Sequence, residues 1–178
     1  MTDKWIILDA MGVVFVVGDD TNELLVPFVQ KRVSNISRET INCIYLSASL
    51  GNLTSQEFWK EVGLVDMYPE IETEYLDNQL TIDPHFGRVI NELAKQYRLG
   101  IISNDLSKWY RYLRAKFALG IFKVVIISGD VGIRKPDPQI YERFLSEANV
   151  VPGHCVFVDD RTKNLKPAND LGMKTVRF

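Results

Sequence analysis

The sequence predicts an α/β protein: a parallel β-sheet between two layers of helices, with an all-helical segment inserted after the first strand. Three observations carry this prediction. Short apolar runs recur along the chain, helical patterns separate most of them, and one long stretch near the N-terminus breaks the alternation. Apolar runs without a polar face are typical of strands buried on both sides. Their alternation with helices favours right-handed crossovers and therefore a Rossmann-like, three-layer architecture.

Each expected strand is a short run of mostly apolar residues. The runs are Trp5–Leu8, Leu99–Ile102, Val124–Ile127, Cys155–Val158 and, closing the sequence, Lys174–Phe178. The first four each run into polar residues, which is where a parallel strand commonly delivers functional side chains.

The expected helices of the sheet layers have apolar residues at helical spacing. In Phe86–Tyr97 they recur at i, i+3, i+4, i+7 and i+11, which places them on one face of a helix. The other helices are expected at Ser107–Phe117, Gln139–Ala148 and Thr162–Leu171.

Residues 18–82 contain only helical patterns. Thr54 followed by Glu57 is a capping-box pattern, and Ser37 followed by Thr40 is a weaker form of it. We expect helices at Asn22–Val33, Ser37–Leu50, Thr54–Val62 and Ile71–Gln79. The chain therefore divides into a core domain, residues 1–17 and 83–178, and a helical cap domain, residues 18–82.

Polar residues at the strand ends are expected to converge on one crevice, because ligands bind outside the carboxyl ends of parallel strands. They are Asp9, Ser103 with Asn104, Lys135, and Asp159 with Asp160. One carboxylate can serve as a nucleophile, and a second can help to hold Mg²⁺ through oxygen ligands. A hydroxyl and an ammonium suit phosphoryl oxygens. This set favours phosphoryl transfer, which depends on positioning and charge neutralisation.

Four segments give the chain a resemblance to the haloacid dehalogenase-like (HAD) hydrolase superfamily. They occur in the order and spacing of the family's motifs: residues 7–13 (ILDAMGV), 101–104 (IISN), 132–138 (GIRKPDP) and 156–160 (VFVDD), with Asn164 downstream. The resemblance spans nearly the whole chain, and the 18–82 segment lies where the family's small helical cap lies.

The resemblance implies roles for these residues. Asp9 is the implied nucleophile, and Ser103, Asn104 and Lys135 hold the phosphoryl group. Mg²⁺ is the implied cofactor, ligated by Asp9, Asp159 and the backbone carbonyl of Met11, with Asp160 and Asn164 in support. The implied substrate is small and phosphorylated or otherwise anionic. Gly18, Asp19 and Asp20 are candidate substrate contacts, although Asp19 and Asp20 could instead begin the first helix of the cap. Phe28, Tyr45, Phe58 and Trp59 either line a pocket or pack the helical core.

Met11 departs from the pattern of the family's phosphatases, which usually carry there the Asp that protonates the leaving group. A thioether cannot exchange protons at neutral pH. General acid–base catalysis contributes roughly 10²–10⁴-fold. We therefore expect low phosphomonoesterase activity unless another group, such as a proton donor from the cap, takes over this role.

Three interpretations stay open at this point. The first is a Mg²⁺-dependent hydrolase that forms an aspartyl-phosphate on Asp9. The second is a ligand-binding or regulatory protein with weak or no turnover. The third is a metal-independent 2-haloacid dehalogenase, which the paired acids Asp159 and Asp160 disfavour.

Charge and cysteine content limit the partners and the cellular compartment that we expect. The net charge of −2 disfavours a whole-chain nucleic-acid binder. It conceals an asymmetry: residues 18–82 carry a net −7, and the remainder carries +5. Cys43 and Cys155 lie far apart, which is typical of a reducing compartment. No apolar stretch reaches the ~20 residues of a membrane helix, so we expect a cytoplasmic protein without membrane or nucleic-acid partners.

Overall fold

The computed structural model describes residues 3–178 and contains a five-stranded, wholly parallel sheet in the order β3-β2-β1-β4-β5. The strands are β1 (Trp5–Leu8), β2 (Arg98–Ser103), β3 (Val124–Ile127), β4 (Cys155–Asp159) and β5 (Lys174–Arg177). The expected strands are thus confirmed, with ends that differ by at most one residue. β1 lies in the centre, between β2 and β4.

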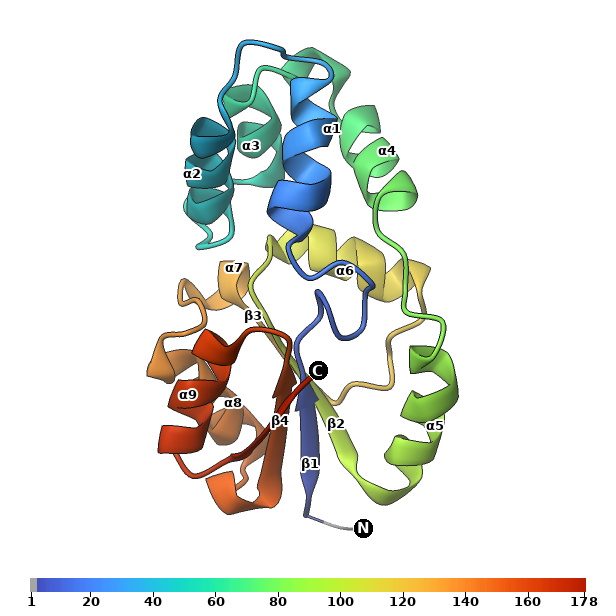
Figure 1. Ribbon diagram of the computed structural model, residues 1–178, viewed down its shortest axis with the longest axis vertical. Helices are drawn as coiled ribbons and strands as arrows, with labels where there is room; N and C mark the ends of the chain where they lie inside the picture. Colours follow the sequence, from blue (N-terminus) through green and yellow to red (C-terminus); the bar gives the residue numbers. More distant parts are fainter. Residues whose placement is uncertain (1–2) are drawn as a thin grey trace.

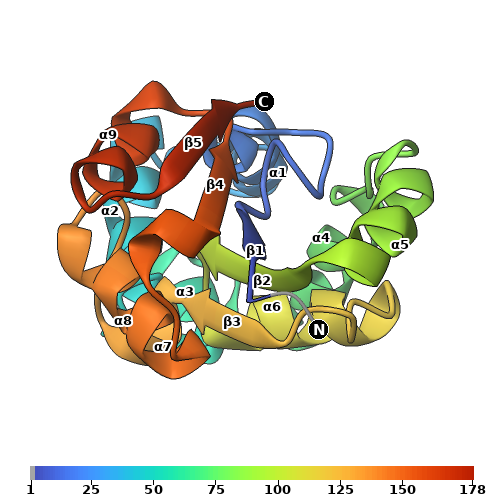
Figure 2. The same ribbon diagram turned by 90° about the horizontal axis from the view of Figure 1, so that it is seen from below.

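Helices cover both faces of the sheet, as expected for the three-layer α/β class. Figure 2 shows α8 (Pro138–Ala148) and α9 (Thr162–Asp170) on one side and α5 (Phe86–Gln96) on the other. Phe144 of α8 packs edge-on against Trp5, and Tyr141 packs against Phe157 of β4. A four-residue helix, α7 (Ser128–Val131), and a 3₁₀ turn (η3, Pro152–His154) were not expected, because such short pieces carry no apolar periodicity.

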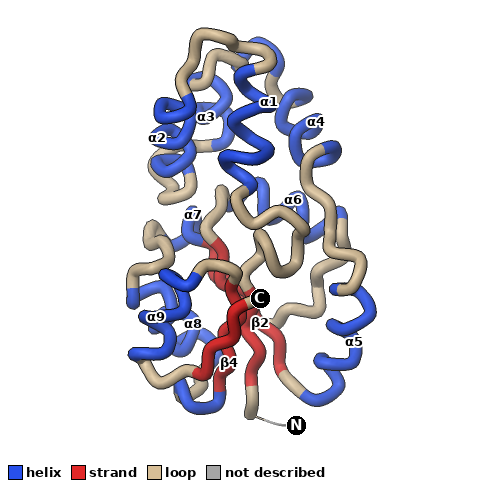
Figure 3. The backbone as a smooth tube through the Cα atoms, viewed as in Figure 1, coloured by secondary structure: helices blue, strands red, loops and turns tan. Residues whose placement is uncertain are grey.

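The secondary-structure elements of the 18–82 segment are all helices or helical turns, and they lie together beyond the carboxyl ends of the strands (Figures 1 and 3). These elements are the π-helical turn η1 (Thr21–Leu25), α1 (Val26–Gln30), α2 (Arg38–Ala48), α3 (Ser55–Glu61), the 3₁₀ turn η2 (Val65–Met67) and α4 (Glu70–Asn78). Thr54 and Glu57 form the expected capping box, and the Ser37 hydroxyl accepts from the Thr40 amide. The single helix expected at Asn22–Val33 is instead η1 followed by α1. Its N-terminal part is wider than an α-helix, since the Val26 amide donates to the Thr21 carbonyl, and Pro27 has no amide hydrogen to donate.

One hydrophobic cluster extends from the sheet into the 18–82 segment. It includes Leu8 of β1, Trp59 of α3, Tyr75 of α4 and Trp109 of α6 (Ser107–Lys116). α6 lies between the sheet and the helices of the segment in Figure 1. In the described part of the chain, residues 3–178, there is no helix both long and apolar enough to cross a membrane.

Candidate active site

Three adjacent strands deliver the central side chains to one point. Asp9 follows β1, Ser103 is the last residue of β2 and Asp159 is the last residue of β4. Because β1 lies between β2 and β4, the three side chains meet at the carboxyl edge of the sheet, where the strand order reverses. Lys135 reaches them from the loop after α7. All four residues are at least nine-tenths buried.

The ammonium of Lys135 bridges the two carboxylates. Its Nζ lies 2.8 Å from Asp9 Oδ1 and 2.7 Å from Asp159 Oδ2. Asn104 fixes the backbone from which this side chain extends: its Nδ2 donates to the Lys135 carbonyl at 2.9 Å, and its Oδ1 accepts from the Lys135 amide at 2.8 Å. The amide of Asn104 therefore positions Lys135, and direct contact of Asn104 with substrate stays a prediction.

The two carboxylates ionise differently. Burial raises the pKa of Asp9 to about 7, although the charge of Lys135 opposes the shift. Burial also disfavours ionisation of Asp159. There, however, the charge of Lys135 and the hydrogen bonds to the carboxylate outweigh burial, so the pKa of Asp159 lies below its usual value. Two of these bonds come from Asn164 Nδ2, at 3.0 Å to each oxygen, and one from the Arg161 amide, at 2.8 Å. Asp159 is thus held as an anion.

Asp160 completes an acidic group that could hold a cation. One carboxylate oxygen from each of Asp9, Asp159 and Asp160 lies within 4.8 Å of the others. A Cβ atom on Gly12 would lie 2.8 Å from the Asp160 carboxylate, and one on Gly18 would clash with it. The absence of a side chain at both glycines therefore lets the Asp160 carboxylate approach the backbone closely. Within the described part of the chain, Asp160 Oδ1 is buried and has no hydrogen-bond partner. A set of carboxylate oxygens with an unsatisfied member fits Mg²⁺.

Ser103 has an unused hydrogen-bonding group. Its Oγ is buried and has no hydrogen-bond partner among residues 3–178, an arrangement that native proteins usually avoid. The hydroxyl borders the same cavity as Asp9 and Lys135. A phosphoryl oxygen placed in this cavity would accept a hydrogen bond from the Ser103 hydroxyl.

The cavity that these side chains share is small, with a volume of about 40 Å³. It is lined by Asp9, Met11, Gly18, Asp20, Thr21, Tyr45, Ser103, Asn104, Arg134, Lys135, Arg161 and Asn164. Gly18, Asp20 and Tyr45 of the candidate substrate contacts therefore line it, whereas Asp19 is not among the lining residues. The Tyr45 hydroxyl donates to the Asn104 carbonyl at 3.2 Å. Phe28, Phe58 and Trp59 pack in the hydrophobic cluster.

Sequence reasoning missed two arginines of the lining. Arg134 precedes Lys135, and Arg161 follows Asp160. The Arg134 Nη1 is buried and has no hydrogen-bond partner in the part of the chain that the structure describes, and the Arg161 Nη2 donates to the Gly18 carbonyl at 2.7 Å. Their position next to motif residues was the available signal, but the direction of a loop side chain does not follow from periodicity.

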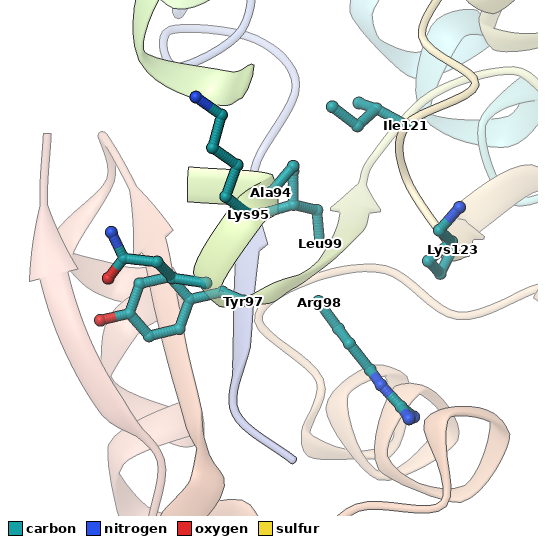
Figure 4. A pocket seen from close by; sticks show the side chains of 8 residues that line it. Ala94, Lys95, Tyr97, Arg98, Leu99, Ile121 and Lys123 are labelled. Carbon is teal, nitrogen blue, oxygen red and sulfur yellow. The ribbon is translucent and has the colours of Figure 1, made fainter. Parts of the chain in front are cut away.

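A larger hollow, of about 680 Å³, lies at the opposite end of the sheet. Figure 4 shows Lys95, Arg98 and Lys123 around it, together with Tyr97 and three aliphatic side chains. None of its eight lining residues carries a carboxylate. The convergent acid, base and hydroxyl groups lie in the small cavity, so size does not identify the site here.

Solved structures of similar fold cover nearly all of the chain. A HAD family enzyme from Bacteroides thetaiotaomicron matches 98% of the chain over 92% of its own length, with a TM-score of 0.81 and 19% identity. A HAD phosphatase from Thermococcus onnurineus matches 98% of the chain over 86% of its own, with a TM-score of 0.71 and 25% identity.

Curated relatives share shorter segments. A glyceraldehyde 3-phosphate phosphatase from Pyrococcus abyssi is 39% identical over 85 residues, which are 46% of this chain and 35% of the relative. The bifunctional epoxide hydrolase 2 of Mus musculus is 47% identical over 55 residues, 31% of this chain and 10% of the relative. The matches thus span about a tenth to a third of these relatives. A family model described as haloacid dehalogenase-like hydrolase matches residues 7–172. The chain belongs to the haloacid dehalogenase-like hydrolase family.

Proposed function

We propose that this protein is a Mg²⁺-dependent phosphomonoesterase that transfers a phosphoryl group to Asp9 and then to water. The observation that carries the proposal is the contact of one buried ammonium with two carboxylates: Lys135 Nζ lies within 2.8 Å of both Asp9 and Asp159. The phosphatase named among the relatives supports the same reaction class.

Each side chain has a task in this scheme. An oxygen of Asp9 attacks phosphorus, while Lys135 and the free hydroxyl of Ser103 hold the phosphoryl oxygens and offset their charge. Asp9, Asp159 and the Met11 carbonyl would hold Mg²⁺, which when bound neutralises further negative charge on the phosphoryl group. Asn164 and the Arg161 amide keep the Asp159 carboxylate in place.

A small substrate suits this site. The cavity volume of about 40 Å³ leaves room for little more than a phosphoryl group beside Asp9. The net charge of −7 over residues 18–82 would repel bulky polyanions, whereas the net +5 of the remainder would attract a single phosphoryl group.

A substrate panel tests the proposal. Phosphate esters, phosphonates and 2-haloacids are offered to the wild-type protein with Mg²⁺ and with excess EDTA. We expect phosphate esters to be hydrolysed only with Mg²⁺, and Asp9→Asn to lower kcat at least about 10³-fold, because an amide cannot replace the attacking carboxylate. Asp137→Asn, which changes an exposed helix-capping residue, is the matched control and should retain activity.

Two results would overturn the proposal. Turnover of haloacids without metal would assign the protein to carbon–halogen chemistry. Absence of turnover on every phosphate ester, together with saturable binding of phosphate, would assign it to the binding or regulatory proteins.

A further inference from the structure

We propose that Asp20 is the proton donor and acceptor of the reaction, in place of the carboxyl group that Met11 does not provide. The inference rests on the proposed phosphatase function and adds a residue to it. Asp20 lies at the start of the 18–82 segment, immediately before η1, and lines the same small cavity as Asp9, Met11 and Ser103. Asp9 and Asp20 are the two carboxyl groups among the residues that line it.

Asp20 does not have the structural role that its sequence position suggests. An Asp before a helical turn commonly caps it through an amide two or three residues on, but Asp20 has helical backbone angles and makes no such capping bond; its local bond is to the adjacent Thr21 backbone. The side-chain contacts at this turn are made by the neighbouring Asp19. Its two carboxylate oxygens accept from Asn22 Nδ2, at 3.2 Å (Oδ1) and 3.0 Å (Oδ2), and its Oδ1 lies 3.4 Å from Arg161 Nη2. Asp20 is nevertheless only 6% exposed. A carboxyl group buried without a capping role calls for another explanation.

The surroundings of Asp20 suit proton transfer near neutral pH. Burial raises the pKa of Asp20 to about 7; the charge of Arg161, the hydrogen bond with the Thr21 backbone and the charge of Arg134 limit the rise, whereas the charge of Asp19 adds to it. The other ionisable groups that sense its charge come from separate elements: Tyr45 of α2, Tyr75 of α4 and Asp105 after β2. A group that titrates near the working pH is present in both protonation states, as a general acid and base requires.

The chemistry balances with Asp20 in this role. In the first step, Asp9 Oδ forms a bond to phosphorus while the bond from phosphorus to the leaving-group oxygen breaks. The Asp20 carboxyl gives its proton to that oxygen, so an alcohol departs and Asp20 becomes a carboxylate. In the second step, Asp20 takes a proton from water as the water oxygen attacks phosphorus, and the bond between phosphorus and Asp9 Oδ breaks, which returns the Asp9 carboxylate. Orthophosphate leaves, and both Asp9 and Asp20 return to their starting states.

The test compares leaving groups that need a proton with those that do not. kcat/KM is measured for n-propyl phosphate and for p-nitrophenyl phosphate in the wild-type protein, Asp20→Asn and Glu23→Gln. Propoxide requires protonation as it leaves, whereas p-nitrophenolate does not. We expect Asp20→Asn to lower kcat/KM for n-propyl phosphate roughly 10²–10⁴-fold and for p-nitrophenyl phosphate by less than about tenfold. Glu23→Gln, which removes the same charge from an exposed side chain three residues away, should leave the ratio of the two values unchanged.

A rescue variant completes the design. In the Asp20→Asn background, Met11→Asp should restore hydrolysis of n-propyl phosphate, because it returns a carboxyl group to the cavity. The ratio of two substrates measured on one preparation does not depend on how much of that preparation is folded. A ratio in Asp20→Asn equal to that of the wild-type protein overturns the role of Asp20 while leaving Asp9 chemistry intact. A wild-type protein that hydrolyses neither ester overturns both.

Discussion

At the scale of single residues, the site depends on buried polar and charged groups whose hydrogen-bonding capacity is only partly satisfied. Lys135 satisfies one oxygen each of Asp9 and Asp159, and Asn164 satisfies Asp159 further. Ser103 Oγ and Asp160 Oδ1 have no hydrogen-bond partner among the described residues. Unpartnered buried polar atoms cost stability, so their concentration at one strand edge marks a place shaped for a ligand.

The ionisation of Asp20 has a consequence for stability that is independent of catalysis. Its pKa rises from 3.8 to about 7 on folding, so the folded protein holds the proton more tightly than the unfolded chain. The stability from this group is therefore fully present below about pH 4 and is lost as the pH rises to about 7. We expect the free energy of unfolding of the wild-type protein, relative to that of Asp20→Asn, to fall over this range by at most roughly 4 kcal/mol.

Denaturant titrations of the two proteins in EDTA, at intervals between pH 4 and pH 8, measure this difference. Asn cannot titrate, so the comparison isolates the carboxyl group. A difference that is constant across the range would mean that Asp20 keeps an ordinary pKa in the folded protein.

The sequence alone predicted the residues at strand ends better than those on loops. Asp9, Ser103 and Asp159 follow or end apolar runs, and a parallel sheet brings such positions together whatever the details of the loops. The bridge made by Lys135 could not be predicted, because it depends on the path of a loop. For the same reason, Asp20 was expected only as a substrate contact or a helix start, and the arginines of the cavity were missed.

At the scale of elements, α4 and α6 are joined by a buried carboxylate. Glu72 Oε2 accepts from the indole nitrogens of Trp59 at 3.1 Å and Trp109 at 2.8 Å, and Glu72 Oε1 lies 2.7 Å from Lys108 Nζ. Glu72 is 4% exposed. One side chain thus links α3, α4 and α6 where the 18–82 segment meets the sheet layers.

Replacing Glu72 should weaken this junction. In Glu72→Leu, two buried indole N–H groups lose their acceptor, so we expect the free energy of unfolding to fall by roughly 2–4 kcal/mol. Glu61→Leu is the control, because Glu61 is exposed at the end of α3, and it should change stability by less than about 0.5 kcal/mol. Equal melting curves for the two variants would show that the carboxylate contributes nothing to the junction.

The limits of element prediction have local causes. Ser37 and Thr54 mark their helix starts correctly, since capping depends on a few adjacent residues. The prediction of one continuous helix at Asn22–Val33 is wrong, because the chain forms a π-helical turn, which is wider than an α-helix, before Pro27. α7 has four residues, too few for a periodic pattern.

At the scale of the whole molecule, the 18–82 segment contributes both to the hydrophobic core and to the cavity. Its aromatic residues share one cluster with α6 and the sheet, and Asp20, Thr21 and Tyr45 border the cavity beside Asp9. The parallel sheet and its helical layers followed from the alternation of patterns, whereas this shared core did not, because packing between distant segments leaves no periodic signal. The division into core and cap domains remains a prediction.

In the proposed reaction, Asp9 carries the phosphoryl group of the intermediate. To detect it, the protein is mixed with p-nitrophenyl phosphate and Mg²⁺, samples are quenched in acid within the first turnover, and the modified peptide is mapped by mass spectrometry. The burst of p-nitrophenol sets the amount of adduct to be found. We predict one phosphoryl group per burst equivalent, located on Asp9 and absent from Asp9→Asn. A burst without any phosphorylated protein, or with the phosphoryl group on another residue, would contradict the account.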